Sequence, residues 1–184
     1  MRKGLAMQDI LRATAELAEE KGLDNLSLLQ IAEKLNIKSP SLYNHVGSLQ
    51  ELSEALAKLA LDRLGDAVRT AADGRSKKAA LTAIAGAYRR FACEHPQLYK
   101  AILRFPTYDS SDVREAGHKV TRILYQVMAP YRYSKADSLH FVRGFRSALH
   151  GFVALEEAGF FKNNEADVDE SFRRLVASLL STIG

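Results

Sequence analysis

The stretch of sequence that decides the fold runs from Ser27 to Val46 and reads SLLQIAEKLNIKSPSLYNHV. Ser27 is a typical N-cap for a helix, and Gln30 lies three residues later, where the glutamine of a capping box stands. Ser39 can cap a second helix, with Pro40 at its first position, where the missing N–H is harmless. The stretch therefore predicts two short helices, the second running to His45, joined by a tight turn.

The apolar residues of this stretch have the spacing of a helix-turn-helix. Asn36 is expected to end the first helix, because asparagine tolerates the left-handed backbone conformation. Ala32 is small where the two helices have to cross closely, and Ile37 is expected to plug the turn. The apolar positions that carry this prediction are Ile31, Ala32, Leu35, Ile37 and Leu42.

The second helix of this pair presents polar side chains that suit contact with DNA. The residues expected to face outward are Lys38, Ser39, Ser41, Tyr43, Asn44 and His45. Each of these side chains can donate a hydrogen bond to a phosphate oxygen or to a base edge. A recognition helix in the major groove requires such donors, so the pattern indicates DNA binding.

The rest of the chain also has a helical pattern. Apolar residues recur every three or four positions and no stretch alternates convincingly with period two, so no strand is expected. The turn residues at 73–76 form the clearest linker. The other expected helices cover residues 8–21, 48–70, 77–93, 96–104, 110–129, 135–158 and 168–182. The predicted fold class is all-α with about nine helices, an N-terminal three-helix unit containing the helix-turn-helix (1–52) and a C-terminal helical bundle (53–184).

Composition excludes several classes of protein. The chain has 184 residues, of which 47% are apolar and 26% charged, as is usual for a globular protein. Its one cysteine, Cys93, cannot form an internal disulfide and is expected to be a small core residue. The histidines lack the close spacing of a metal site, and no metal or cofactor is expected. No apolar run is long enough for a membrane span or a signal peptide, so a cytoplasmic protein is expected.

Residues 27–46 resemble the signature of TetR-family repressors. That signature reads as an isoleucine-alanine pair, a glycine-valine turn, and then leucine-tyrosine-x-histidine-phenylalanine. The resemblance implies an all-helical homodimer that binds double-stranded operator DNA and is a repressor released by a small-molecule effector. Two residues depart from the pattern: Asn36 stands at the turn glycine, and Leu49 replaces a lysine that in many members contacts a phosphate.

The resemblance also implies roles for the residues of the second helix. Tyr43 and His45 are implied to hold backbone phosphates of the DNA. Base edges are the implied contacts of Ser39, Pro40, Ser41 and Asn44, and Lys38 can serve either role.

The C-terminal part resembles the branch of the family that is named for a tryptophan-histidine-glycine motif. The matching residues are 146–152 and 159–161, with Leu149 in place of the tryptophan. Aromatic and polar residues of the C-terminal region are candidates for an effector pocket, although each aromatic taken singly also fits a plain core position. For Arg146 and His150, a polar patch in the pocket and a solvated or interface-rim face both stay open. The candidates are Tyr88, Phe91, Tyr99, Phe105, Tyr125, Arg146 and His150.

The last two expected helices carry residues that suit a dimer interface. Small residues share one face of the helix at 135–158, and apolar residues form a stripe along 168–182. One protomer has limited room to bury both faces, whereas a two-fold four-helix bundle would cover them. The candidate interface residues are Gly144, Ala148, Gly151, Phe172, Leu175, Val176 and Leu179.

The distribution of charge leaves a second function open. The formal net charge is +4, yet residues 1–52 hold six basic and seven acidic side chains. The acidic balance there, together with Leu49, favours an alternative: a helical ligand-binding or interaction protein that no longer binds DNA. An enzyme is not expected, because no nucleophile–base grouping, paired-carboxylate motif or glycine-rich phosphate loop is present.

Overall fold

The computed structural model describes residues 5–104, 107–162 and 166–184. Within these ranges the chain has nine α-helices and no strand, which confirms the predicted all-α fold class. The elements are α1 (Met7–Lys21), the 3-10 helix η1 (Leu23–Asn25), α2 (Leu28–Lys34), α3 (Ser39–Tyr43), α4 (Leu49–Ala72), α5 (Lys77–Glu94), α6 (Pro96–Leu103), α7 (Ser111–Met128), the 3-10 helix η3 (Ala129–Tyr131), α8 (Lys135–Glu157) and α9 (Val168–Ser181).

The predicted helix boundaries agree with the structure to within two residues, and α3 shows the most informative difference. Lys38, rather than Ser39, is its N-cap and has extended backbone, so Pro40 is the second residue of the helix. The helix ends at Tyr43, and Asn44 and His45 follow it instead of lying within it.

The chain divides into two compact units. The first unit contains the chain up to Arg63 together with His95–Gly117, and the second contains Leu64–Glu94 and His118–Gly184. Helices α1, α2, α3 and α6 lie wholly in the first unit, α5, α8 and α9 lie wholly in the second, and α4 and α7 have residues in both. The assignment of separate functions to 1–52 and 53–184 stays a prediction.

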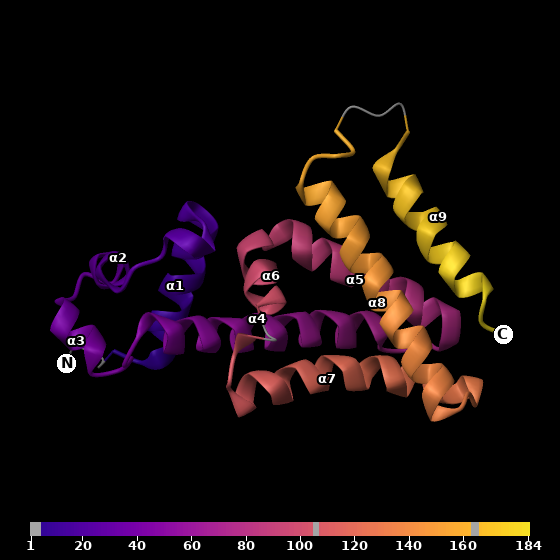
Figure 1. Ribbon diagram of the computed structural model, residues 1–184, viewed down its shortest axis with the longest axis horizontal. Helices are drawn as coiled ribbons and strands as arrows, with labels where there is room; N and C mark the ends of the chain where they lie inside the picture. Colours follow the sequence, from indigo (N-terminus) through magenta and orange to yellow (C-terminus); the bar gives the residue numbers. More distant parts are fainter. Residues whose placement is uncertain (1–4, 105–106, 163–165) are drawn as a thin grey trace. The chain divides into compact units, whose positions relative to one another are not determined.

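The first unit is built around α1, which packs against α2 on one side and α6 on the other (Figure 1). The periodic apolar stripe of α1 supplies the buried side chains Ile10, Leu17 and Ala18. Gly22 ends α1 with a φ of +89°, a left-handed value that favours glycine, and its N–H donates to the Ala18 carbonyl. The predicted stop at Gly22 is therefore confirmed.

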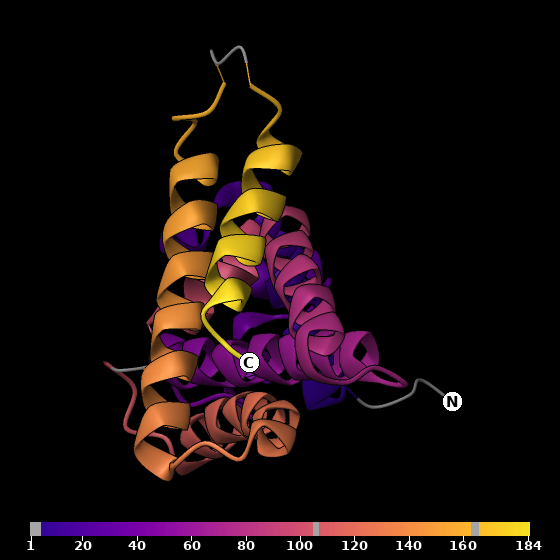
Figure 2. The same cartoon turned by 90° about the vertical axis from the view of Figure 1, so that its right-hand side faces the viewer.

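The second unit places α8 and α9 side by side and antiparallel, as both Figure 1 and Figure 2 show, with α5 packed against both. The turn that precedes α5 contains Gly74 at a φ of +66°, which confirms the predicted linker. The apolar core of these three helices contains Leu81, Ile84, Phe91, Phe145, Leu149, Val153, Phe172, Val176 and Leu180.

Cys93 lies near the end of α5, and its side chain is exposed, so the predicted core position is wrong. Phe91 and Ala92 are buried, and each further residue of a helix turns the side chain by about 100°. The next position, Cys93, is therefore carried out of the core. Its Sγ atom lies 3.8 Å from a carboxylate oxygen of Glu156.

Candidate functional site

A complete capping box opens α2. The Gln30 N–H donates to the Ser27 hydroxyl at 3.3 Å, and the Ser27 N–H donates to the Gln30 side-chain oxygen at 2.9 Å. These two bonds satisfy N–H groups that the first turn of a helix leaves without partners. The predicted start of the helix-turn-helix is confirmed at atomic level.

The turn between α2 and α3 depends on the backbone of Asn36. Its φ of +53° is left-handed, a conformation that asparagine adopts at modest cost. Two backbone bonds close the turn, from Asn36 N to the Glu33 carbonyl at 2.9 Å and from Ile37 N to the Ala32 carbonyl at 3.0 Å. Asn36 thus supplies the left-handed backbone conformation at the position where the TetR-family signature has glycine.

Buried apolar side chains fix α2 against α3. Ile31 and Leu42 have no exposed surface, and Ala32 and Val46 are almost fully buried. Leu35 and Ile37 are half-buried. The predicted spacing therefore places its apolar residues at the junction of the two helices, and α3 is held by packing rather than by its own length.

The residues predicted to contact DNA lie on the outer side of this junction. Ser39 is half-buried and the other six are exposed: Lys38, Pro40, Ser41, Tyr43, Asn44 and His45. The side chain of Tyr43 is 55% exposed, which is unusual for a large aromatic ring. An exposed ring with a hydroxyl at its tip can contact a sugar and donate to a phosphate at the same time.

Helix α4 begins directly after this surface with Ser48 as its N-terminal cap. The Glu51 N–H donates to the Ser48 hydroxyl at 3.1 Å, and the Gly47 N–H donates to the Glu51 carboxylate at 2.8 Å. Leu49, at the first position of α4, is partly exposed. An aliphatic side chain there cannot form the phosphate contact of the lysine that many family members have.

Lys34 joins α2 to α1 by ion pairs. Its ammonium group lies 2.7 Å from a carboxylate oxygen of Glu20 and 3.5 Å from one of Glu16. The hydrogen bond to Glu20, followed by the remaining interactions with both carboxylates, raises the pKa of Lys34. The single positive charge of Lys34 thus offsets part of the negative charge of two acidic side chains of α1.

The candidate effector residues belong to both units. Tyr99 is buried on α6 in the first unit, whereas Phe91 is buried on α5 in the second. Tyr88, Tyr125 and His150 are half-buried in the second unit, and Arg146 is exposed there. Phe105 lies outside the described residues.

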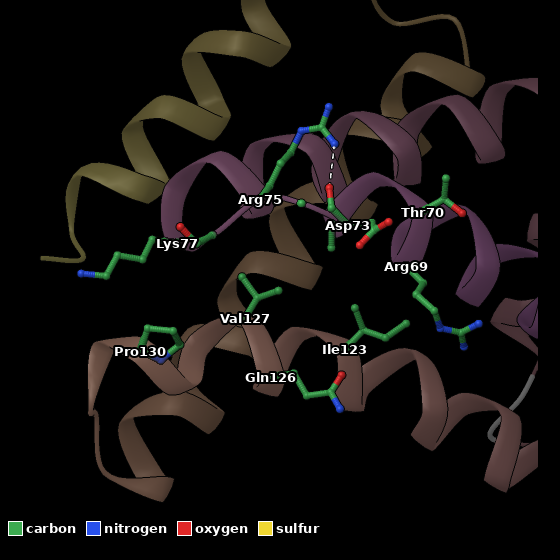
Figure 3. Close-up of a pocket in the computed structure, with 12 residues that line it drawn as sticks. Arg69, Thr70, Asp73, Arg75, Lys77, Ile123, Gln126, Val127 and Pro130 are labelled. Atoms are coloured by element: carbon green, nitrogen blue, oxygen red, sulfur yellow. Dashed lines mark hydrogen bonds between the residues drawn. The ribbon is translucent and has the colours of Figure 1, made fainter.

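A cavity of about 650 Å³ lies within the second unit, where none of the candidate residues lines it (Figure 3). Ile123, Gln126, Val127 and Pro130 form one wall, and the end of α4 and the turn before α5 form the other. The charged side chains around it are Arg69, Asp73, Arg75 and Lys77. Figure 3 shows the Arg75 guanidinium on the side of the turn that faces away from α7. The sequence predicted the turn at 73–76 but not that this turn and α7 line one cavity.

The candidate dimer residues fall into two groups. Phe172 and Val176 are buried within the protomer. Gly144 is exposed, and Ala148, Gly151, Leu175 and Leu179 are half-buried. A Cβ atom added to Gly144 or Gly151 would meet open space, so this face of α8 is uncovered within the protomer.

A charged cluster that sequence reasoning missed connects three helices of the second unit. Arg89 of α5 makes a two-pronged ion pair with Glu156 of α8, at 2.6 and 2.8 Å, and a third contact of 2.8 Å with Asp169 of α9. Its guanidinium also lies 5.5 Å from the ring centroid of Phe152 and 5.0 Å from that of Phe172. The hydrogen bond to Glu156 is the main cause of the raised pKa of Arg89. Because Arg89 and Glu156 are 67 residues apart, no local sequence pattern predicts their contact.

No described helix is long and apolar enough to cross a membrane. Among the same residues, no group of three or more histidine, cysteine, aspartate or glutamate side chains is placed to hold a metal ion.

Family models match both parts of the chain. Residues 10–56 match the model described as bacterial regulatory proteins, tetR family. Residues 81–179 match the model described as tetracyclin repressor-like, C-terminal domain.

Individual proteins are similar over nearly the full length. An uncharacterized HTH-type transcriptional regulator of Bacillus subtilis, YobS, is 32% identical, covering 98% of this chain and 93% of its own. A second such regulator, Rv0681 of Mycobacterium tuberculosis, is 31% identical, covering 95% of this chain and 80% of its own. A solved structure of a protein of unknown function from Rhodococcus sp. RHA1 is 26% identical with a TM-score of 0.84, covering 99% of this chain and 97% of that one.

Proposed function

Because the chain belongs to the TetR family of bacterial transcriptional regulators, we propose that it is a homodimeric repressor released from its operator by a small-molecule effector. In this proposal residues 1–52 bind the operator and residues 53–184 bind the effector and form the dimer. Operator binding would place the protein in the cytoplasm, where bacterial DNA lies. The family is one of regulators rather than of enzymes.

One observation carries the proposal: a short helix, α3, is fixed by buried residues, and six polar or DNA-compatible residues within it and directly beside it are exposed. Leu42 and Ile31 anchor the helix from inside. Tyr43 and His45 would hold phosphates, and Asn44 would approach a base edge. Rigid anchoring matters because a recognition helix has to keep its register in the major groove.

The proposed mechanism is a linkage between two sites. An effector that binds better to the conformation with misplaced recognition helices lowers DNA affinity by the same coupling free energy. Helix α4 has residues in both units and is the proposed lever. The aromatic and polar candidates remain the proposed pocket, and the cavity in Figure 3 is a second place for a ligand with an apolar body.

We further propose that the C-terminal region belongs to the tryptophan-histidine-glycine branch. Leu149-His150-Gly151 stands at the motif, and the side chain of Leu149 is buried. A large apolar side chain at that position fits the core role that a tryptophan would have.

Substitutions of Tyr43 and Asn44 test the DNA-binding assignment. The DNA probe is a duplex selected by the wild-type protein from a randomised library, called the selected duplex. We expect Tyr43→Ala to weaken binding about tenfold on every high-affinity sequence, because a phosphate contact carries no sequence information. Asn44→Ala should instead relax discrimination at one base position of each half-site, by a factor of about ten. Fluorescence anisotropy on single-base variants of the selected duplex measures both effects.

Phe160→Ala is the matched control, because Phe160 is a 70% exposed aromatic residue of the second unit. It should bind the selected duplex as the wild type does. Wild-type affinity in both the Tyr43 and the Asn44 variant would contradict the assignment. It would favour the alternative, a helical ligand-binding or interaction protein, to which the aliphatic Leu49 at the start of α4 lends support.

The open face of α8 provides a test of the dimer. We expect Gly151→Arg to convert a dimer into a protomer of 20.4 kDa in sedimentation velocity, because a long charged side chain cannot be buried in a helix–helix interface. The protomer itself should keep its stability, since an added Cβ meets open space there.

Gly86→Arg is the control for this experiment. Gly86 lies on α5, and a Cβ added there also meets open space, but the residue is not among the proposed interface positions. This variant should sediment as the wild type does. A Gly151→Arg protein that remains dimeric would remove α8 from the interface.

A further inference from the structure

Helix α6 receives its N-terminal cap from a distant residue of α1. Pro96 is at the start of α6, and His95 before it supplies no side-chain cap. The Glu19 carboxylate takes that role: one oxygen accepts from Gln97 N at 3.2 Å and the other from Leu98 N at 3.1 Å. A carboxylate at a helix N-terminus also interacts favourably with the helix dipole. The first turn of α6 is therefore completed by the helix-turn-helix unit.

The side chain of Gln97 returns a bond to the end of α1. Its oxygen accepts from Leu23 N at 2.9 Å, directly after Gly22. A Cβ atom added to Gly22 would lie 3.3 Å from Asn25 and 4.0 Å from the Gln97 oxygen, in addition to straining the backbone. Glycine thus lets the chain leave α1 within reach of Gln97.

Further contacts hold the remainder of α6. Lys100 lies 3.8 Å from the Asp24 carboxylate, and Arg104 makes a hydrogen bond to the same group. Leu98 and Tyr99 are buried almost completely. Polar contacts at both ends and apolar burial between them fix α6 to α1 and η1.

Helix α2 connects α1 to the DNA-facing surface of α3. Lys34 pairs α2 with Glu16 and Glu20 of α1, and α2 packs on α3. A chain of contacts therefore runs from α6 through α1 and α2 to the outward residues of α3. The orientation of α1 is set from one side by α6.

We propose that Glu19 and Gln97 are positioning residues for DNA binding: they lock α6 to α1, and this lock and the bound DNA stabilise each other. The proposal rests on the proposed operator-binding function. Reciprocity follows from linkage, since a contact that favours the DNA-binding arrangement has to be favoured by DNA in turn. Neither residue touches the DNA in this account.

Glu19→Ala and Glu19→Gln test the lock. In free protein we expect hydrogen exchange of the Gln97 and Leu98 amides to accelerate about tenfold in Glu19→Ala, as loss of a helix cap implies. Glu19→Gln keeps one carbonyl oxygen and should give a smaller acceleration. In the wild type, adding the selected duplex should slow these amides, which a merely structural cap would not show.

Operator affinity separates the proposed lock from a simple change of charge, because the two predict opposite effects of Glu19→Ala. Removing an acidic side chain from a DNA-binding unit should tighten binding, and the matched control Glu33→Gln, an exposed residue of α2, should behave so. The lock predicts that Glu19→Ala instead weakens binding to the selected duplex about three- to tenfold. Unchanged α6 exchange in Glu19→Ala would overturn the cap, and faster exchange with unchanged or tighter DNA binding would overturn its positioning role. A wild-type protein that selects no duplex would refute the operator-binding function itself, a result separate from both.

Discussion

Arg89→Ala is expected to lower the free energy of unfolding of the second unit by about 3–5 kcal/mol. The substitution leaves the Glu156 carboxylate without its two-pronged partner, although the Glu156 side chain is only 22% exposed. It also removes the guanidinium that lies against the rings of Phe152 and Phe172. Urea unfolding followed by far-ultraviolet circular dichroism measures the change.

Two further variants separate the charge from the packing. Arg89→Met combined with Glu156→Leu removes both charges and keeps apolar volume, so it should be much more stable than Arg89→Ala. Arg173→Ala removes an exposed arginine of α9, whose pairs contribute little, and should change stability by less than about 0.5 kcal/mol. If Arg89→Ala unfolds like Arg173→Ala, the cluster does not hold the three helices together.

Leu42→Ala is expected to destabilise the first unit by about 2–5 kcal/mol and to abolish measurable operator binding. Leu42 has no exposed surface and packs α3 against α2, so a cavity at this position releases the recognition helix itself. Urea unfolding and anisotropy on the selected duplex measure the two effects on one sample.

The matched control is Leu29→Ala, the same substitution in the same helix-turn-helix. The side chain of Leu29 is 58% exposed on α2, so its removal should change stability by less than about 0.5 kcal/mol. Equal effects of the two variants would mean that burial at the α2–α3 junction does not hold α3 in place.

Local chemistry explains why so much of the helix-turn-helix could be predicted. The capping box at Ser27, the left-handed Asn36 and the spacing of Ile31 and Leu42 act over a few residues, and each has a recognisable residue type. The same is true of the linker at Gly74. The error at Cys93 came from its apolar neighbours, because one step along a helix is enough to leave the core.

The partners of the acidic side chains of α1 could not be predicted from the sequence. Glu16 and Glu20 pair with Lys34, and Glu19 caps α6, nearly eighty residues further along the chain. Their partners are brought close by tertiary packing, which has no local signature. The excess of acidic side chains in residues 1–52, which favoured the alternative function, is thus partly engaged in contacts within the first unit.

Whether the chain binds operator DNA is decided by titrating the wild-type protein into the DNA upstream of its own gene and into a scrambled duplex over a series of salt concentrations. We expect the upstream DNA to bind at least about a thousandfold more tightly than the scrambled duplex. We also expect the logarithm of affinity to fall linearly with the logarithm of salt concentration. Equal affinity for both duplexes at every salt concentration, or no binding to either, would contradict operator binding by this chain.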